Sequence, residues 1–425
     1  MWKEFPQDLR LPYAEFISFM STVHLAFPKN NFIYYQFPPP QLESFFHQGL
    51  IMSMTENWTD KENKNLKSSQ FIKAAYNSFF KTGFKVDNRI SNKINPAYDF
   101  KKRRVMIPFS FGKDSLLTYA ICRELNLDVI PIFIIEPRNV YENKFKLKMI
   151  RDFEKEFHQP IEIYQVPLTD LKHWDAYSWG WDLLLTQYMM YLIPFQHYYK
   201  PEYFFWSNEL NCSQTIVDPE GFFVDRTFDQ HWRWLQTMNT AIGLFGCNTQ
   251  VGSLVEVISE YADNIILHSR YPQIAKYQLT CQAENSRKRW CGDCYDCANT
   301  YMYLVSVGMD PKNIWLMDNM FSKQKYHKLK LFDSPKTKNY FWRDHFPFLR
   351  DEKLLALYFA SKRGIKDHAV RLFDQEYLSE TKKKLVKLKQ MYLTVHEFHT
   401  VPDDLIKTVS RIFNEELRNV FHKLN

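Results

Sequence analysis

The central part of the chain alternates short apolar runs with amphipathic segments. The apolar runs are rich in Val, Ile, Phe and Tyr and predict buried strands. The segments between them repeat an apolar residue every three to four positions, which predicts helices that cover a sheet. Strands are predicted at residues 105–111, 128–136, 161–168 and 202–208. Helices are predicted at 114–125 and 144–157. A further long helix is expected to end within 188–193, and another to open within 252–262. Strand and helix in alternation predict an α/β fold with a doubly wound parallel sheet.

The chain is helical in character on both sides of this pattern. Apolar residues at helical spacing recur at 16–26, 71–80, 353–361, 381–393 and 406–421. We therefore divide the chain into an N-terminal extension at 1–100, the α/β domain at 101–310 and a helical C-terminal region at 311–425. The C-terminal helices are expected to pack on the domain or on a second subunit.

The first predicted strand ends in a polar loop, Ser110-Phe111-Gly112-Lys113-Asp114-Ser115, and a helix begins at once. Gly112 is expected to allow a tight turn, and the amides at the start of the helix form a ready anion site. Lys113 adds a positive charge for a phosphate oxygen, while Asp114 suits a metal ion or the turn itself. The loop is no Walker A motif, because Asp114 stands where Ser or Thr is required and the earlier glycine is missing. It nevertheless predicts a site for a nucleotide phosphate, with an ordinary strand-to-helix turn as the alternative.

Polar residues also follow two other predicted strands. Glu136 and Arg138 follow the second strand, and Ser207-Asn208-Glu209 follows the fourth. Because ligands bind at the carboxyl ends of the strands in such sheets, we expect these residues to open onto one crevice with the loop. The alternative is that they simply cap the helices that come next.

Four cysteines form a second motif. Cys281, Cys291, Cys294 and Cys297 have the spacing C-x9-C-x2-C-x2-C, which suits a tetrahedral Zn²⁺ ion, and Gly292 eases the backbone inside the first knuckle. An iron–sulfur cluster is the less favoured alternative. Four thiolates leave no open coordination position, so the metal is expected to be structural. The remaining cysteines are expected to serve packing, and they are Cys122, Cys212 and Cys247.

Composition narrows the class of protein. The net charge of +7 is spread over the chain, so it permits an anionic substrate without demanding nucleic acid. The basic run at 101–104 is interpreted as the solvated start of the first strand. Aromatic residues make up 17% of the chain, which predicts buried aromatic layers. We find no signal peptide and no run of eighteen apolar residues, and therefore expect a soluble, cytoplasmic protein.

The loop and the cysteines together resemble known families. The loop resembles the PP-loop of the ATP pyrophosphatase superfamily, S-G-G-x-D-S, with Phe111 in place of the first glycine. Residues 252–305 resemble the zinc segment of 7-cyano-7-deazaguanine synthase and, equally, the UDP-N-acetylmuramoyl-L-alanyl-L-glutamate epimerase family, in which a Trp stands where Trp290 does here. Residues 207–209 resemble a Ser-Asn-Glu element of that epimerase family. The resemblance covers about residues 105–310.

The resemblance implies an activity that uses ATP and Mg²⁺. Such families adenylate a carboxylate or an amide-like oxygen and release pyrophosphate. The resemblance implies nucleotide binding by Ser110, Phe111, Gly112, Lys113, Asp114, Ser115 and Asn208. Lys113, Asp114 and Glu209 are the implied catalytic residues, with Asp114 as first and Glu209 as second candidate ligand for Mg²⁺.

Three functional interpretations remain open from the sequence. The first is an adenylating enzyme that acts on a small carboxylate-bearing substrate, followed by ligation, amidation or epimerisation. The second is an epimerase-like activity in which His231, His268 or Glu209 serves as the base. The third is a zinc-stabilised protein that binds or modifies RNA, with charge from residues 287–289 and a stacking surface from Trp290.

Overall fold

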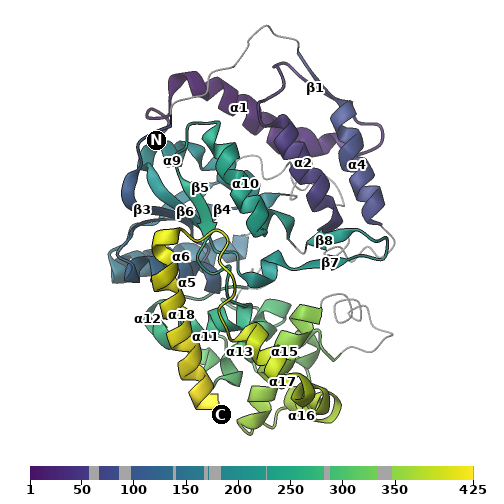
Figure 1. Ribbon diagram of the computed structural model, residues 1–425, viewed down its shortest axis with the longest axis vertical. Coiled ribbons are helices and arrows are strands. Elements are labelled where there is room, and N and C mark those ends of the chain that lie inside the picture. Colours follow the sequence, from purple (N-terminus) through teal and green to yellow (C-terminus); the bar gives the residue numbers. More distant parts are fainter. Residues whose placement is uncertain are drawn as a thin grey trace. The chain divides into compact units, whose positions relative to one another are not determined.

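The structure, a computed structural model, describes residues 1–56, 67–85, 97–136, 140–166, 171, 183–225, 227–281, 288–332 and 347–424. It is an α/β fold (Figure 1). Its main sheet has five strands in the order β5-β4-β3-β6-β9. Strands β3 and β6 pair in parallel, as do β4 and β5. The strands are β3 (Lys101–Pro108), β4 (Asp128–Ile135), β5 (Glu162–Gln165), β6 (Pro201–Trp206) and β9 (Gln250–Ser253).

The four predicted strands of the α/β domain are confirmed, but a fifth was missed. Strand β9 is only four residues long, and the apolar residues that follow it repeat at helical spacing. The helix predicted to open in 252–262 is α11, which begins only at Glu260. Strand β3 starts at Lys101, so the basic run lies inside the strand, with residues 101–103 exposed.

The chain forms two compact units, each built from separate segments. Unit 1 consists of residues 1–106, 166–204 and 212–252, and unit 2 of residues 107–165, 205–211 and 253–425. The first hundred residues therefore share a unit with two later stretches of chain.

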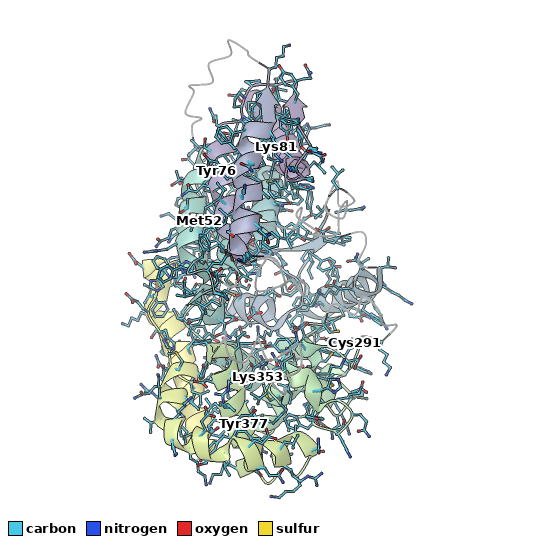
Figure 2. All side chains as sticks on the ribbon, turned by 90° about the vertical axis from the view of Figure 1, so that its right-hand side faces the viewer. Met52, Tyr76, Lys81, Cys291, Lys353 and Tyr377 are labelled. Carbon is cyan, nitrogen blue, oxygen red and sulfur yellow. The ribbon has the colours of Figure 1, made fainter. Side chains whose placement is uncertain are left out.

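Unit 1 combines helices with two small sheets. Its helices are α1 (Gln7–Thr22), α2 (Glu43–Ser53), α4 (Ser68–Lys81), α8 (Leu184–Tyr191), α9 (Ile193–Tyr199) and α10 (Trp232–Gly243). The small sheets pair β1 (Ile33–Tyr35) with β2 (Thr82–Phe84) and β7 (Thr215–Val217) with β8 (Phe223–Asp225). The aromatic layers expected from composition are present. Phe16, Phe19 and Phe46 are buried, and the ring centroid of Phe46 lies 6.2 Å from each of the other two. Met52, Tyr76 and Lys81 lie on α2 and α4 (Figure 2).

Unit 2 holds the loop, the cysteines and the helical C-terminus. Its helices are α5 (Lys113–Glu124), α6 (Val140–Phe157), α11 (Glu260–Arg270), α12 (Pro272–Ala275), α13 (Tyr295–Ser306), α15 (Pro347–Lys362), α16 (His368–Glu376), α17 (Leu378–Tyr392) and α18 (Asp403–Leu424). Helix α15 packs on α13, α16 and α17, and α18 packs on α11 (Figure 1). Arg270 of α11 pairs with Glu416 of α18 at 2.9 Å and with Glu124 of α5 at 2.6 Å. The predicted C-terminal helices thus exist and pack on the α/β part of their own unit.

No helix in the described part of the chain is both long and apolar enough to cross a membrane.

Candidate active site and metal centre

The loop between β3 and α5 makes its turn at Phe111. This residue has a left-handed backbone, with a φ of 61°, where glycine is usually favoured. Its carbonyl accepts a 2.8 Å hydrogen bond from the amide of Leu279. Its ring is fully buried, with centroid distances of 4.8 Å to Phe109 and 5.8 Å to Phe153. The Phe111 side chain is therefore part of the core, while its backbone shapes the loop.

The prediction that Gly112 provides the tight turn is wrong. Gly112 is the N-cap of α5 and has an extended backbone, with φ −68° and ψ 159°, which any residue can adopt. A Cβ atom at this position would meet only the Ser110 hydroxyl, at 3.3 Å. The backbone conformation does not require a glycine at position 112. The absence of a side chain there leaves the backbone amides at the start of α5 uncovered.

The start of α5 gathers hydrogen-bonding groups. The first intrahelical bond runs from the amide of Leu116 to the Gly112 carbonyl, at 3.1 Å. The amides of residues 113–115 precede that bond and have no carbonyl of the helix to receive them. The Ser115 hydroxyl donates to the Gly112 carbonyl at 3.0 Å. The Ser110 hydroxyl oxygen lies 3.4 Å from the Ser115 hydroxyl oxygen. Such a helix start, at the positive end of the helix dipole, suits an anion.

Lys113 lies among carboxyl groups from three segments of unit 2. Its Nζ donates to Asp114 Oδ1 at 2.7 Å and Oδ2 at 2.8 Å, and it lies 3.9 Å from Glu260 Oε1. Glu209, which follows β6, and Asp263 of α11 are close enough to act on its charge. We call Lys113, Asp114, Glu209, Glu260 and Asp263 the acidic cluster. It brings together two predicted catalytic residues of the loop and the predicted Glu209.

The acidic cluster has one basic side chain and four carboxyl groups. Burial opposes the charge of Lys113, but the surrounding carboxylates outweigh it and hold the lysine pKa well above its usual value. Burial raises the pKa of Glu209 and Asp263 well above the usual range; Lys113 opposes this and the neighbouring carboxylates add to it. Buried negative charge in excess is unfavourable, and protonation or a bound cation relieves it.

Asp263 is the most unusual member of the cluster. It is completely buried, neither of its carboxyl oxygens meets an N–H or hydroxyl donor among the described residues, and its carboxyl group lies against that of Asp114. It is not needed as a helix cap, because Ser259 is the N-cap of α11 and accepts a 3.1 Å bond from the amide of Ala262. Buried polar groups are nearly always satisfied, so two oxygens that meet no such donor, beside a lysine and other carboxylates, favour a ligand that supplies positive charge.

Sequence reasoning missed Glu260 and Asp263. Both lie in the first turn of α11, where acidic residues ordinarily favour the helix dipole. Because the helix was expected to open eight residues earlier, they were not placed at a helix start at all. Spacing alone holds no signal that would separate them from ordinary first-turn acids.

The Ser-Asn-Glu segment after β6 is held from both sides. The Asn208 carbonyl accepts a 2.8 Å bond from the Ser253 hydroxyl, and Asn208 is buried. Glu209 Oε2 accepts a 2.7 Å bond from the amide of Asn211. The Ser207 hydroxyl oxygen is buried with no hydrogen-bond partner in the described part of the chain. This segment delivers Glu209 to the acidic cluster.

The other candidates lie in different surroundings. Glu136 is buried at the end of β4, where its carbonyl accepts a 2.7 Å bond from Asn143, and Arg138 lies outside the described residues. His231 is the N-cap of α10 in unit 1 and accepts a bond from the amide of Arg233. His268 is half-buried, with its Nε2 2.6 Å from Gln278 Oε1, and desolvation lowers its pKa to about 4. Both histidines thus have structural contacts where they stand.

The four cysteines converge as predicted. Their sulfur atoms all lie within 4.8 Å of one another and could hold a metal ion such as zinc. Individual sulfur–sulfur distances are 3.7 Å from Cys291 to Cys297, 3.7 Å from Cys294 to Cys281 and 3.4 Å from Cys294 to Cys297. Four zinc–sulfur bonds of about 2.3 Å in a tetrahedron place the sulfurs about 3.8 Å apart, so the cluster fits a single ion.

Gly292 is required by the first knuckle, as predicted. Its φ is 65°, and a Cβ atom there would lie 2.1 Å from Asp318 Oδ2. Lys325 donates to both the Gly292 carbonyl and Asp318 Oδ1, each at 2.7 Å. The Lys325–Asp318 ion pair therefore lies directly against the knuckle, and only a glycine at position 292 leaves room for it.

Trp290 offers no stacking surface, which corrects one expectation. It is 2% exposed, and its indole N–H donates to the Ile314 carbonyl at 2.7 Å. The guanidinium of Arg289 donates to the carbonyls of Lys276 and Gln278 at 3.0 and 3.3 Å. Arg287 lies outside the described residues. Trp290 and Arg289 are thus held by contacts within the protein, whereas Lys288 is exposed.

Comparisons with protein-family models, curated proteins and solved structures found no match for this chain. The site is therefore interpreted from its own residues.

Proposed function

We propose that this protein is an ATP-dependent adenylating enzyme of the PP-loop type, acting on a small substrate with a carboxylate or an amide-like oxygen. The observation that carries the proposal is the acidic cluster at the start of α5, in particular the buried carboxyl group of Asp263, which meets no N–H or hydroxyl donor among the described residues and lies against the carboxyl group of Asp114. A helix start with a charged lysine suits phosphates, while the excess of carboxylates suits a divalent cation. A nucleoside triphosphate with its bound divalent cation supplies both the phosphates and the cation.

The reaction needs stabilisation of its leaving group. A substrate oxygen attacks the α-phosphorus of ATP, the bond to the bridging oxygen breaks, and that oxygen departs with the electron pair as pyrophosphate. Negative charge grows on the pyrophosphate as the bond breaks. Lys113 and the amides of residues 113–115 stabilise that charge, because they are fixed before the reaction begins.

The acidic cluster is the proposed place for Mg²⁺. This ion prefers oxygen ligands and is commonly held by one or two carboxylates together with substrate phosphates. Asp114 and Asp263, whose carboxyl groups lie against each other, would hold it together with the phosphates. When bound, the ion neutralises charge on the phosphates.

We further propose that the four cysteines hold a structural Zn²⁺. The sulfurs are close enough for one tetrahedral ion, whereas a four-iron cluster bonds each thiolate to a separate iron and needs a wider spacing. All four positions are filled by protein, so this metal serves folding.

The adenylated substrate can pass to ligation, amidation or epimerisation. The shared step in all three is the release of pyrophosphate. The epimerase-like outcome requires a base beside the activated α-carbon. Glu209 lies in the acidic cluster, while His231 and His268 have structural contacts.

The proposal is tested by product analysis. The purified protein is incubated with ATP, Mg²⁺ and a panel of small carboxylic acids, and AMP and pyrophosphate are expected in equal amounts with the correct acid. Lys113→Ala should abolish release. Lys276→Ala, which removes the same charge from the exposed pair with Glu156, should not. Formation of ADP and phosphate, or full turnover by Lys113→Ala, would contradict the proposal.

A further inference from the structure

Glu352 connects the helical C-terminus to the segments that carry the acidic cluster. It lies on α15 and is completely buried. Its Oε1 accepts a 2.8 Å bond from the amide of Tyr261. Its Oε2 accepts from the Asn211 side-chain amide at 3.1 Å and from the Tyr303 hydroxyl at 3.2 Å. A buried carboxylate with three donors is well satisfied, in contrast to Asp263.

Two of these donors are direct neighbours of the acidic cluster. Tyr261 follows Glu260 in the first turn of α11. Asn211 donates its backbone amide to Glu209 Oε2 at 2.7 Å. The carboxylate of Glu352 is therefore hydrogen-bonded both to the segment that carries Glu209 and to the start of the helix that carries Glu260.

The C-terminal region also holds the connection between β9 and α11. The Ser259 hydroxyl donates to the Tyr392 carbonyl at 3.0 Å. Glu256 accepts bonds from the amide and hydroxyl of Thr400 at 2.6 and 2.7 Å. Since these contacts fix the residues just before α11, the start of α11 depends on residues more than a hundred positions later in the chain.

We propose that Glu352 is a positioning residue, which holds Glu209 and the first turn of α11 in the arrangement that binds a divalent cation. The inference rests on the proposed function, because it assigns the helical C-terminus a role in the same site. A carboxylate suits this role, since all three of its partners are donors and a carboxylate only accepts. Its neighbour on α15, Lys353 (Figure 2), is engaged elsewhere, with the Leu329 carbonyl at 2.7 Å.

The test uses two variants that disrupt the hydrogen bonds of Glu352 in different ways. Glu352→Gln keeps the shape but places an amide N–H group against donors. Asn211→Ala removes one partner and leaves the carboxyl group of Glu352 in place. Asp351→Asn is the control, because it neutralises the next residue on α15, which pairs with Arg350 at 3.3 Å. Mn²⁺ affinity is measured for the full-length protein by calorimetry, and ATP affinity is measured separately in the presence of a chelator.

Both test variants are expected to weaken Mn²⁺ binding by about tenfold, in keeping with the loss of a hydrogen bond to a charged group. ATP affinity in chelator and Mn²⁺ affinity of Asp351→Asn should stay at the wild-type value. Wild-type Mn²⁺ affinity in Glu352→Gln would overturn the inference. A loss in Glu352→Gln but not in Asn211→Ala would also overturn it, since charge alone would then explain the effect. If the wild-type protein bound neither Mn²⁺ nor ATP, the proposed function itself would fail.

Discussion

Phe111 shows how one residue can keep a backbone conformation that usually belongs to glycine. A left-handed backbone costs a residue with a side chain about 1–2 kcal/mol. A fully buried Phe ring contributes about 1.5–3 kcal/mol, which offsets that cost. Burial of the ring thus accounts for a Phe at this turn of the loop.

Phe111→Gly should therefore destabilise the protein although it relieves the backbone. We expect a loss of about 2–4 kcal/mol in the free energy of unfolding, because emptying a buried aromatic position costs more than the backbone gains. Denaturant unfolding measures this directly. A variant as stable as wild type would show that Phe111 does not contribute to the core as described.

Gly112 and Gly292 should respond to alanine in opposite ways. Gly112 has an extended backbone and room for a Cβ, so Gly112→Ala should change the unfolding midpoint little but weaken ATP binding, because the Cβ crowds the helix start. Gly292→Ala should destabilise the fold by several kcal/mol, since its Cβ would overlap Asp318. Thermal unfolding and nucleotide titration of both variants separate the two roles. Equal effects on stability would contradict the assignment.

At the scale of elements, the sequence pattern placed β3, β4, β5 and β6 and the loop before α5, because apolar runs and helical periodicity are local signals. It did not reveal β9 or the start of α11, since four residues give too short a run and Leu254, Val255 and Val257 imitate a helix. Glu260 and Asp263 remained hidden for the same reason. Their meeting with Lys113 is a contact between distant segments, which local periodicity does not report.

The acidic cluster predicts a trade-off between stability and binding. Asp263→Asn should raise the free energy of unfolding by about 1 kcal/mol or more, because the folded state penalises the charge of this buried carboxyl. Its folded pKa is raised, so its contribution to stability is present below the unfolded pKa and is lost as pH rises through the folded pKa. The gain of the variant should therefore be larger at about pH 8 than at about pH 5.

The same substitution should abolish Mg²⁺ binding. In the wild-type protein, cation affinity should rise with pH, because protons compete for Glu209 and Asp263. Urea unfolding at two pH values and metal titration test both halves. Glu415→Gln is the control for the loss of one negative charge, since Glu415 pairs with the exposed Arg411 at 3.0 Å on α18. An Asp263→Asn variant that is less stable than wild type and still binds the cation would contradict the role assigned to Asp263.

At the scale of the whole molecule, the helical C-terminus is predictable as helices but not as a partner of the site. Amphipathic periodicity marked α15, α17 and α18, whereas the bonds from Glu352 and Thr400 join positions far apart in the chain. The composition of unit 1 from three separate segments is equally beyond local patterns. Such long-range pairing depends on packing, which a single sequence does not display.

The four-cysteine cluster should be essential for the stability of unit 2. We expect one zinc and no iron per chain by elemental analysis, and Cys294→Ser should lose the zinc and unfold at a markedly lower temperature, because metal binding and folding are coupled. Cys247→Ser changes a buried cysteine that lies in the other unit, and should keep its zinc. Retention of zinc and of the wild-type midpoint by Cys294→Ser would refute the structural role.

The central claim is that residues 110–115 and the acidic cluster bind the phosphates of ATP together with a divalent cation. Calorimetric titration of ATP with Mg²⁺ tests it most directly, since it needs no knowledge of the substrate. We predict that the wild-type protein and Lys276→Ala bind ATP with equal affinity, and that Lys113→Ala loses at least about tenfold, because a buried charged contact to phosphate is removed. Absence of binding by the wild-type protein, or unchanged affinity in Lys113→Ala, would contradict the account.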